Sequence, residues 1–192
     1  MTDQSVDNKR RRLLTAATTG VGLAGTAGML VPFAGSMLPS EKAKAAGAPV
    51  EVDISDIGPG RQITVEWRGK PVWIIGRSPE TLDFLATMDD ALADPDSELD
   101  QQPDYARNEH RSIKKEVLVL VGICTHLGCS PKYRPELAAE MEGAFLCACH
   151  GSRFDLAGRV YRNVPAPTNL VVPPHRYLSD TVILIGEDQE PA

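Results

Sequence analysis

The first fifty residues carry a long uncharged run behind a short basic stretch. Residues 1–12 are polar and end in Lys9-Arg10-Arg11-Arg12, and residues 13–38 contain no charged side chain. A spanning helix needs about 20 apolar residues, whereas the apolar region of a cleaved secretory signal runs to roughly 7–15. The length therefore favours an uncleaved transmembrane anchor over residues 13–38. A cleaved signal peptide, using a small-residue site such as Ala46-Gly47-Ala48, is the alternative.

The arginines before this run indicate its route and its orientation. The pattern Arg10-Arg11-x-Leu13-Leu14 resembles a twin-arginine export signal, and the Gly-, Ala- and Thr-rich run has the weak hydrophobicity of such signals. Basic residues that flank a span stay on the cytoplasmic side. We therefore expect residues 1–12 in the cytoplasm of a bacterium, an anchor in its inner membrane, and everything after Pro39 in the periplasm.

Residues 39–48 separate the anchor from the remainder of the chain. Their sequence, PSEKAKAAGA, is small, polar and rich in alanine, and it has no hydrophobic face. We interpret this segment as a flexible hinge before a periplasmic domain of residues 49–192. Simple slack between two parts is the alternative interpretation.

Short apolar strands and turns alternate from residue 49 onward. Residues 50–54 and 63–67 alternate apolar and polar positions with period two, and the turn at 68–71 predicts a hairpin into 72–75. Further strands are predicted at 117–123, 144–146, 160–161, 170–172 and 181–185. Several short strands with regular turns are typical of an antiparallel all-β domain.

Residues 78–115 interrupt this rhythm with a helix–loop insertion. Residues 79–93 predict a helix capped by Ser78, because apolar residues recur at spacings of three and four on one face. These apolar residues are Leu82, Leu85, Met88 and Leu92. Residues 94–111 are acidic and contain proline, so we expect an exposed loop, with a solvated linker as the alternative.

All four cysteines of the chain lie in two short loops. The first loop reads Cys124-Thr125-His126-Leu127-Gly128-Cys129 and the second Cys147-Ala148-Cys149-His150-Gly151-Ser152. Structural zinc sites favour Cys-x2–4-Cys pairs, so the Cys-x-Cys spacing fits zinc poorly and leaves both histidines without a role. Two structural disulfides would likewise leave the matched Cys and His placements to chance. Each loop offers one cysteine and one histidine as possible metal ligands.

These two motifs resemble those of the Rieske iron–sulfur family. The resemblance implies a [2Fe–2S] cluster whose inner iron is bound by Cys124 and Cys147 and whose outer iron is bound by His126 and His150. It also implies a disulfide between Cys129 and Cys149, which persists in an oxidising compartment such as the periplasm. Ser152 is expected to donate a hydrogen bond to a bridging sulfide.

Other positions fit the family less closely. High-potential members carry a tyrosine whose hydroxyl bonds a ligand sulfur, and Phe154 stands at that position here. Residues 163–167 resemble the proline loop that covers the cluster, with Val164 where the family has glycine, so the cluster-binding loops extend over about 123–168. His110 and His175 have no metal-like neighbours, and we expect both on the surface.

The net charge of the chain limits which kinds of partner it can bind. With 20 basic and 26 acidic residues the net charge is −6, and no basic stripe exists beyond the arginines before the anchor. This argues against a nucleic-acid partner.

Taken over its whole length, the chain resembles the Rieske subunits of bacterial cytochrome bc1 complexes, which are ubiquinol–cytochrome c oxidoreductases. The resemblance implies a redox subunit that accepts an electron from ubiquinol at the quinol-oxidation site of cytochrome b. The electron then passes to cytochrome c1, coupled to proton translocation in a dimeric complex. His150, or else His126, would contact the quinol and accept its proton.

Two other functions are alternatives to this one. The first is the small subunit of a periplasmic molybdenum oxidase such as an arsenite oxidase, which the long insertion and the uncleaved anchor disfavour. The second is a binding module that uses its cluster only structurally. The exposed histidines that the motif implies argue against it.

Overall fold

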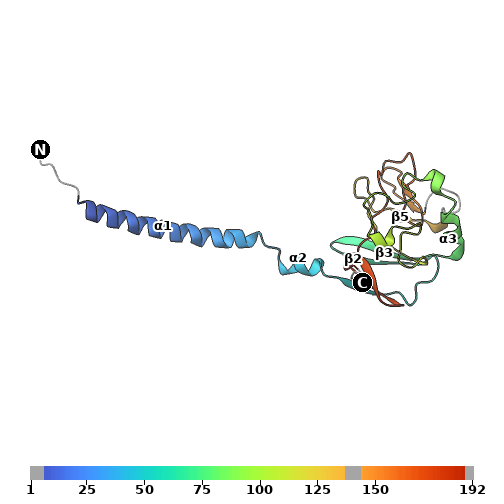
Figure 1. Cartoon of the computed structure of the whole chain (residues 1–192), viewed down its shortest axis with the longest axis horizontal. Helices are drawn as coiled ribbons and strands as arrows, with labels where there is room; N and C mark the ends of the chain where they lie inside the picture. The colour runs from blue at the N-terminus through green and yellow to red at the C-terminus, as the bar shows by residue number, and fades with distance from the viewer. Residues whose placement is uncertain (1–6, 137–143, 189–192) are drawn as a thin grey trace. The chain divides into compact units, whose positions relative to one another are not determined.

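The computed structural model describes residues 7–136 and 144–188, except for the side chain of Ala46. The chain divides into two units, Met1–Ala45 and Ala46–Ala192. The first unit is helical and the second contains all the strands (Figure 1).

Helix α1, Asn8–Ser36, occupies most of the uncharged run. Asp7 caps it, because its carboxylate accepts hydrogen bonds from the backbone N–H groups of Lys9 and Arg10. Its 29 residues make a helix about 43 Å long, and the hydrocarbon core of a bilayer is about 30 Å thick. By length and composition α1 can cross a membrane, a test that signal sequences near an N-terminus also pass.

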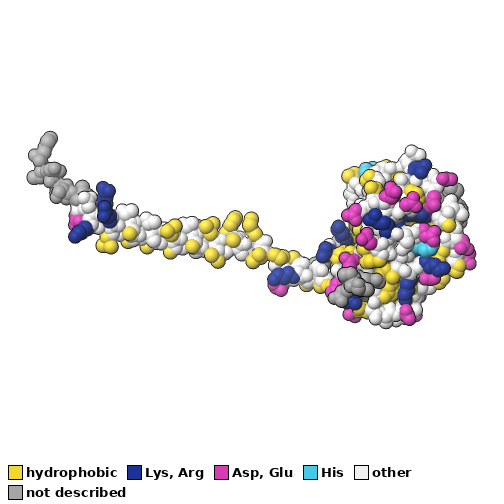
Figure 2. All heavy atoms as spheres, viewed as in Figure 1, with side chains coloured by type: hydrophobic (Ala, Val, Ile, Leu, Met, Phe, Trp, Pro, Cys, Tyr) yellow, Lys and Arg dark blue, Asp and Glu magenta, His cyan; other side chains and the backbone are white. Residues whose placement is uncertain are grey.

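The surface of α1 suits an apolar environment. Figure 2 shows basic side chains gathered at its N-terminal end and hydrophobic side chains along the remainder. Four hydroxyl groups in the apolar part donate to backbone carbonyls of the preceding turn, which leaves no unbonded hydroxyl at these positions. These hydroxyls belong to Thr15, Thr18, Thr26 and Ser36.

The expected hinge contains a short helix. Helix α2, Glu41–Ala46, is supported by an ion pair between Lys44 and Glu41 at 2.7 Å. Both side chains of the pair are more than half exposed, so the pair adds little stability. A helix of six residues is marginal without packing.

The described residues of the second unit form three antiparallel sheets, which confirms the predicted all-β class. The first has the order β1-β9-β8, the second β2-β3-β4 and the third β5-β6-β7, and every strand pair is antiparallel. The strands are β1 Val50–Asp53, β2 Gln62–Trp67, β3 Lys70–Gly76, β4 Val117–Val121, β5 Lys132–Tyr133, β6 Phe145–Leu146, β7 Arg153–Phe154, β8 His175–Ser179 and β9 Val182–Ile185. The predicted hairpin is confirmed as β2–β3.

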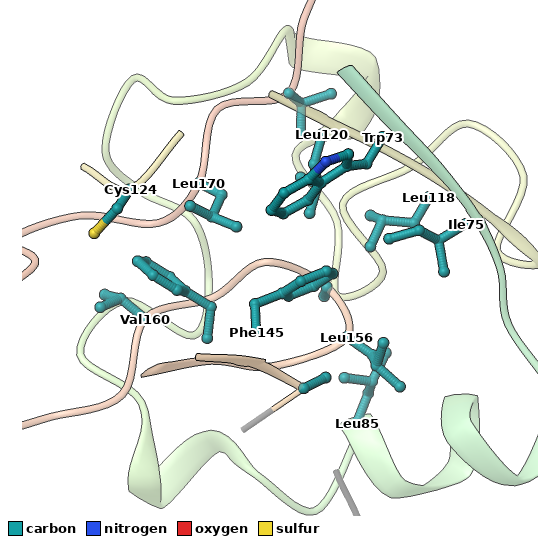
Figure 3. Close-up of a cluster of buried hydrophobic side chains, with 14 of the residues drawn as sticks. Trp73, Ile75, Leu85, Leu118, Leu120, Cys124, Phe145, Leu156, Val160 and Leu170 are labelled. Atoms are coloured by element: carbon teal, nitrogen blue, oxygen red, sulfur yellow. The ribbon is translucent and has the colours of Figure 1, made fainter. Parts of the chain in front are cut away.

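The β2-β3-β4 sheet is the middle layer of the domain. Side chains alternate along β3, so Val72 and Ile74 face one way while Trp73 and Ile75 face the other. The first pair belongs to a core shared with β1 and β9. The second pair belongs to a core that contains Phe145 from β6 (Figure 3). The buried strand β4 therefore leads directly from the middle layer into the first cysteine loop.

The predicted helix of the insertion is shorter than expected. Helix α3, Pro79–Leu85, begins at Ser78, whose hydroxyl accepts from the N–H of Thr81 as predicted. It ends at Leu85 instead of residue 93, because Leu92 has extended backbone and forms a β-bridge with Tyr161. All four apolar residues of the predicted face are nevertheless buried. Two short 3-10 helices, η1 Asp89–Ala91 and η2 Asp104–Ala106, follow α3.

The expectation of an exposed loop at residues 94–111 is wrong for several of its residues. Asp94, Ser97, Gln102, Ala106 and Arg111 are all buried. Asp94, Ser97 and Arg111 bond to segments that follow the second cysteine loop, so the insertion packs into the domain.

Two expectations near the C-terminus are also corrected. Residues 170–172 form isolated backbone bonds and no strand, whereas β8 begins at His175. His175 was expected on the surface, but only 1% of it is exposed. Its backbone N–H donates to the hydroxyl of Tyr105 at 2.8 Å, and its Nδ1 lies 2.8 Å from the carbonyl of Pro173. Burial lowers the pKa of His175.

Candidate metal centre

The two cysteine loops close on themselves in the same way. In the first, the N–H of Cys124 donates to the carbonyl of Cys129 at 2.7 Å, and the N–H of Gly128 donates to the carbonyl of Cys124 at 3.1 Å. In the second, Cys147 donates to Ser152 at 2.8 Å and Gly151 donates back to Cys147 at 2.9 Å. Two equivalent loops thus present their first cysteines at matching positions.

A glycine makes each loop possible. Gly128 has φ +85° and Gly151 has φ +77°, and both occupy the same place relative to the first cysteine. This left-handed conformation costs other residues free energy, which glycine avoids. This conformation is the physical reason for a glycine at the same place in both motifs.

Two thiols remain free at the base of the loops. Cys124 and Cys147 are unpaired and only 2% exposed each. Burial raises the pKa of the Cys124 thiol, hydrogen bonds from the N–H of His126 and the hydroxyl of Ser152 lower it, and the neighbouring Cys147 raises it. The net effect is a raised pKa, so the Cys124 thiol must lose its proton when it binds iron as a thiolate.

Two imidazole rings lie against each other in the more accessible part of the loops. The ring centroids of His126 and His150 are 4.8 Å apart and the rings are nearly perpendicular. His150 is exposed and His126 is partly exposed. Leu127, which directly follows His126 in the first loop, is 70% exposed. The centre therefore has a buried sulfur end and an accessible nitrogen end.

The other two cysteines form a disulfide. Cys129 and Cys149 are joined, with Cα atoms 6.8 Å apart. Their sulfurs lie within 4.8 Å of the Cys147 sulfur, so three cysteine sulfurs are clustered there. Disulfide sulfurs are not thiolates, which leaves Cys147 and Cys124 as the candidate thiolate donors.

Residues 163–168, which contain the proline segment, are hydrogen-bonded to both loops. The N–H of Ala166 donates to the hydroxyl oxygen of Ser152 at 3.0 Å. The hydroxyl of Thr125 donates to the carbonyl of Thr168 at 2.7 Å. Nothing in the sequence singled out Thr125, because no motif predicts that a hydroxyl bonds a distant backbone group.

Gly122 is a second residue that the sequence did not single out. A side chain at this position would collide with the indole ring of Trp73. Trp73 stacks on Phe145 with ring centroids 5.3 Å apart. Gly122 thus allows the chain to pass over the core two residues before Cys124. Its only sequence signal was its place between a buried strand and a cysteine.

The residues fit a [2Fe–2S] cluster of mixed ligation. Two free thiols suit one iron and two imidazoles suit the other, and the four side chains come from two loops with equivalent closure. Such a centre transfers one electron at a time.

Comparison with known proteins identifies the family. The family described as Rieske [2Fe-2S] domain matches residues 100–174, and the family described as Ubiquitinol-cytochrome C reductase Fe-S subunit TAT signal matches residues 1–40. The chain is 60% identical to the ubiquinol-cytochrome c reductase iron-sulfur subunit of Allochromatium vinosum, over 98% of this chain and 94% of that protein. It is 44% identical to the subunit of that name from Bradyrhizobium diazoefficiens, over 96% and 99%.

A solved structure described as a hyperthermophilic respiratory Complex III matches 88% of this chain and 98% of its own chain, with 28% identity and a TM-score of 0.49.

The fold and the paired loops define a Rieske protein with a [2Fe–2S] cofactor. Within that class, the chain belongs to the family of ubiquinol–cytochrome c reductase iron–sulfur subunits.

Proposed function

We propose that this chain is the electron-transfer subunit of a bacterial cytochrome bc1 complex. In this role it accepts one electron from ubiquinol at the quinol-oxidation site of cytochrome b and passes it to cytochrome c1, coupled to proton translocation. The observation that carries the proposal is the identity of 60% over nearly the whole chain to a subunit of that named function. The same names favour this role over a molybdenum oxidase subunit.

The proposed ligands are Cys124 and Cys147 for the inner iron and His126 and His150 for the outer iron. Their support is the free, buried state of both thiols and the pairing of both imidazoles. Ser152 is fully buried and is the proposed hydrogen-bond donor at the sulfur end.

The two histidines are the proposed contacts for the quinol. An imidazole bound to iron through one nitrogen keeps a second nitrogen, which can accept a hydrogen bond from a quinol hydroxyl and then hold its proton. The exposure of His150 and Leu127 supports this, since a quinol needs an apolar approach to an accessible ring. His150 is the more accessible ring and the first choice for the contact.

The proposed placement has residues 1–12 in the cytoplasm, an anchor at 13–38 and the domain of residues 49–192 in the periplasm. The twin-arginine match over residues 1–40 and the apolar helix α1 support it. The segment 39–48 is the proposed hinge, which lets the domain move between two partners in a dimeric complex. Ten extended residues reach roughly 33–36 Å, whereas ten helical residues span about 15 Å.

Quinol oxidation in membranes tests the function. A strain lacking the gene should lose ubiquinol–cytochrome c reductase activity and regain it with the wild-type chain. The His150→Ala chain should insert into membranes but restore no activity. Restored activity with His150→Ala, or none with the wild type, would refute the proposal.

A second experiment tests the hinge. The double variant Lys42→Pro/Lys44→Pro should slow quinol oxidation strongly while the reduction potential and the spectrum stay unchanged. The matched control Lys42→Ala/Lys44→Ala removes the same charges and keeps a chain that can extend or coil. If the proline variant turns over as fast as the control, the segment is only slack.

A further inference from the structure

Three arginine side chains are buried around the turn that follows the second cysteine loop. Arg77, Arg111 and Arg159 are 3%, 0% and 1% exposed. The turn comprises residues 155–159 and begins directly after Phe154. Ser152 lies three residues before the turn, so its Cα is at most about 10–11 Å from that of Asp155. All three guanidinium groups bond to this turn, which follows the second cysteine loop by a few residues.

Arg111 binds the turn and the base of the proline segment together. Its Nη1 donates to the carbonyls of Ala157 at 3.1 Å and Gly158 at 3.3 Å. Its Nη2 donates to the carbonyl of Leu170 at 2.7 Å and to Oε1 of Gln102 at 2.9 Å. Every one of these acceptors is uncharged.

Arg77 approaches the same turn from the end of β3. Its Nη1 donates to the carbonyls of Leu156 at 3.0 Å and His110 at 2.8 Å, and its Nη2 donates to the hydroxyl of Ser112 at 2.7 Å. These acceptors are also uncharged.

Only Arg159 has an ionic partner. Its Nε lies 2.8 Å from the carboxylate of Asp155 and its Nη1 lies 3.1 Å from that of Asp89. In the part of the chain that the structure describes, no carboxylate lies within 4.0 Å of Arg77 or Arg111. The hydrogen bonds of Arg77 and Arg111 therefore go to uncharged groups alone, while the Asp155 carboxylate acts on both guanidinium groups, and the Asp94 carboxylate on Arg111, from beyond contact distance.

These charges are retained despite the cost of burial. Burial lowers the pKa of both Arg77 and Arg111 to about 10, which leaves both protonated at neutral pH. Burying an unpaired charge is unfavourable, so a fold without a use for the charge would be more stable with an apolar side chain.

The buried positive charges can stabilise the negative charge that the cluster gains on reduction. With neutral imidazoles, two ferric ions are balanced by two sulfides and two thiolates, so the oxidised centre is neutral overall. Reduction adds one electron and leaves one negative charge. A fixed positive charge in a medium of low dielectric constant stabilises that state over a longer range than in water.

We propose that Arg77 and Arg111 raise the reduction potential of the centre through the positive charges of their buried guanidinium groups. Neither group has a carboxylate in contact among the described residues. The inference rests on the ligands proposed above. The two arginines would raise the reduction potential of a centre to which Phe154 offers no hydroxyl group. A purely structural role is the competing explanation, since both side chains also bond several carbonyls.

Neutralising Arg111 without removing it separates the two explanations. Gln102→Glu places a carboxylate on Nη2 of Arg111 and keeps the size of the side chain and its hydrogen bond to Arg111, while the two bonds that the amide nitrogen donates to the carbonyls of Ser97 and Leu99 are lost. The matched control is Gln101→Glu, which makes the same change one residue away on a partly exposed side chain. Both variants are made in the full-length chain and titrated by redox potentiometry with electron paramagnetic resonance detection.

Gln102→Glu should make reduction about tenfold less favourable, which is about 59 mV for a one-electron couple. The rhombic signal of the reduced centre should be unchanged, and Gln101→Glu should give less than a third of the shift. Equal shifts in both variants, or none in Gln102→Glu, would overturn the proposal.

A second variant tests the proposal if Gln102→Glu loses its cluster. Ser112→Asp places a carboxylate on Arg77 and should lower the potential in the same direction. If both variants fold but lose the signal, the arginines serve to retain the cluster and the proposal is wrong. A wild type that lacks the rhombic signal would instead refute the proposed ligands, so the two failures are distinguishable.

Discussion

The middle sheet and the cluster loops of the same domain are stabilised in different ways. Strands β3 and β4 are paired over five residues, and β4 is buried along its whole length. Strands β5, β6 and β7 are two residues long, and the loops around them depend on a disulfide, on single hydrogen bonds and on buried arginines. Apolar burial suffices for the sheet, whereas the loops need covalent and polar links.

This difference separates stability from chemistry. A defect in the sheet should lower the stability of the domain and leave the properties of the centre intact. A defect in the loops should alter the centre first. The predictions below test that separation, beginning with the largest effect.

Removing one proposed ligand should abolish the centre altogether. Changing Cys124, His126, Cys147 or His150 to Ala should eliminate the rhombic electron paramagnetic resonance signal of the reduced [2Fe–2S] cluster, because each variant lacks one of four ligands. Ala148→Ser, an exposed change in the same loop, is the control and should keep the signal. A purified wild type with one zinc and no iron would contradict the assignment.

A cavity in the sheet should lower the stability of the domain and leave the centre unchanged. Ile74 is fully buried between the sheets, and Ile74→Ala should cost about 2–5 kcal/mol of the free energy of unfolding. Molecules that remain folded should show the wild-type spectrum and potential. Chemical denaturation measures the first and redox titration the second, with the exposed Thr64→Ala as control. A changed potential in Ile74→Ala would show that sheet and centre are coupled.

Breaking the disulfide should affect the loops alone. The cysteines are separated by 20 residues, and closing a loop of this size contributes roughly 3 kcal/mol. Cys129→Ser/Cys149→Ser should therefore lose iron faster on incubation with a chelator, while the strand pairs stay formed by circular dichroism. Equal rates of iron loss in variant and wild type would show that the link is dispensable for the loops.

The sequence predicted the sheet and the chemistry of the centre well, because both leave local signals. Alternation identified β2, the turn at residues 68–71 identified the hairpin to β3, and helical spacing identified the core residues Leu82 and Leu85. The cysteine and histidine motifs indicated the cofactor of the family. The cap at Ser78 followed from its place before Pro79.

The links between elements left no local signal. Arg111 and Gln102 lie in a stretch of polar residues that resembles a solvated loop, and their acceptors lie up to 59 residues away. Strand β8 combines histidine, arginine and tyrosine, so its pattern indicated no strand until Ile183 and Ile185 of β9 were placed beside it. Tertiary contacts decide these features.

Buried polar groups outside the loops should make stability depend on pH. Burial lowers the pKa of His175, so at acidic pH the unfolded state binds a proton that the folded state resists. The contribution is fully present above the unfolded pKa of about 6.5 and decreases as the pH falls below it. His175→Asn should reduce the loss of unfolding free energy between pH 7.5 and pH 5.5. The partly exposed His110, changed to Asn, should reduce it less, and equal effects would contradict this account.

The smallest predicted effect concerns Phe154, which belongs to both regions. It is fully buried, pairs with Phe145 across β6 and β7, and shares its core with Cys124 and Cys147. Phe154→Tyr adds one hydroxyl group near the proposed ligand sulfurs. If it donates to a sulfur, it stabilises the reduced form and raises the potential, which for the wild type should lie within about −150 to +300 mV.

The same hydroxyl without a partner would behave differently. A buried, unpaired hydroxyl costs about 1–3 kcal/mol of stability and leaves the potential unchanged. Phe145→Tyr is the matched control, because it adds the same group to the same core on the face that stacks against Trp73. Voltammetry and thermal unfolding of both variants decide the question. A higher potential in Phe154→Tyr alone would show that one hydrogen bond can tune the centre from within the core. Lower stability in both variants with no change in potential would place the hydroxyl out of reach of the sulfur.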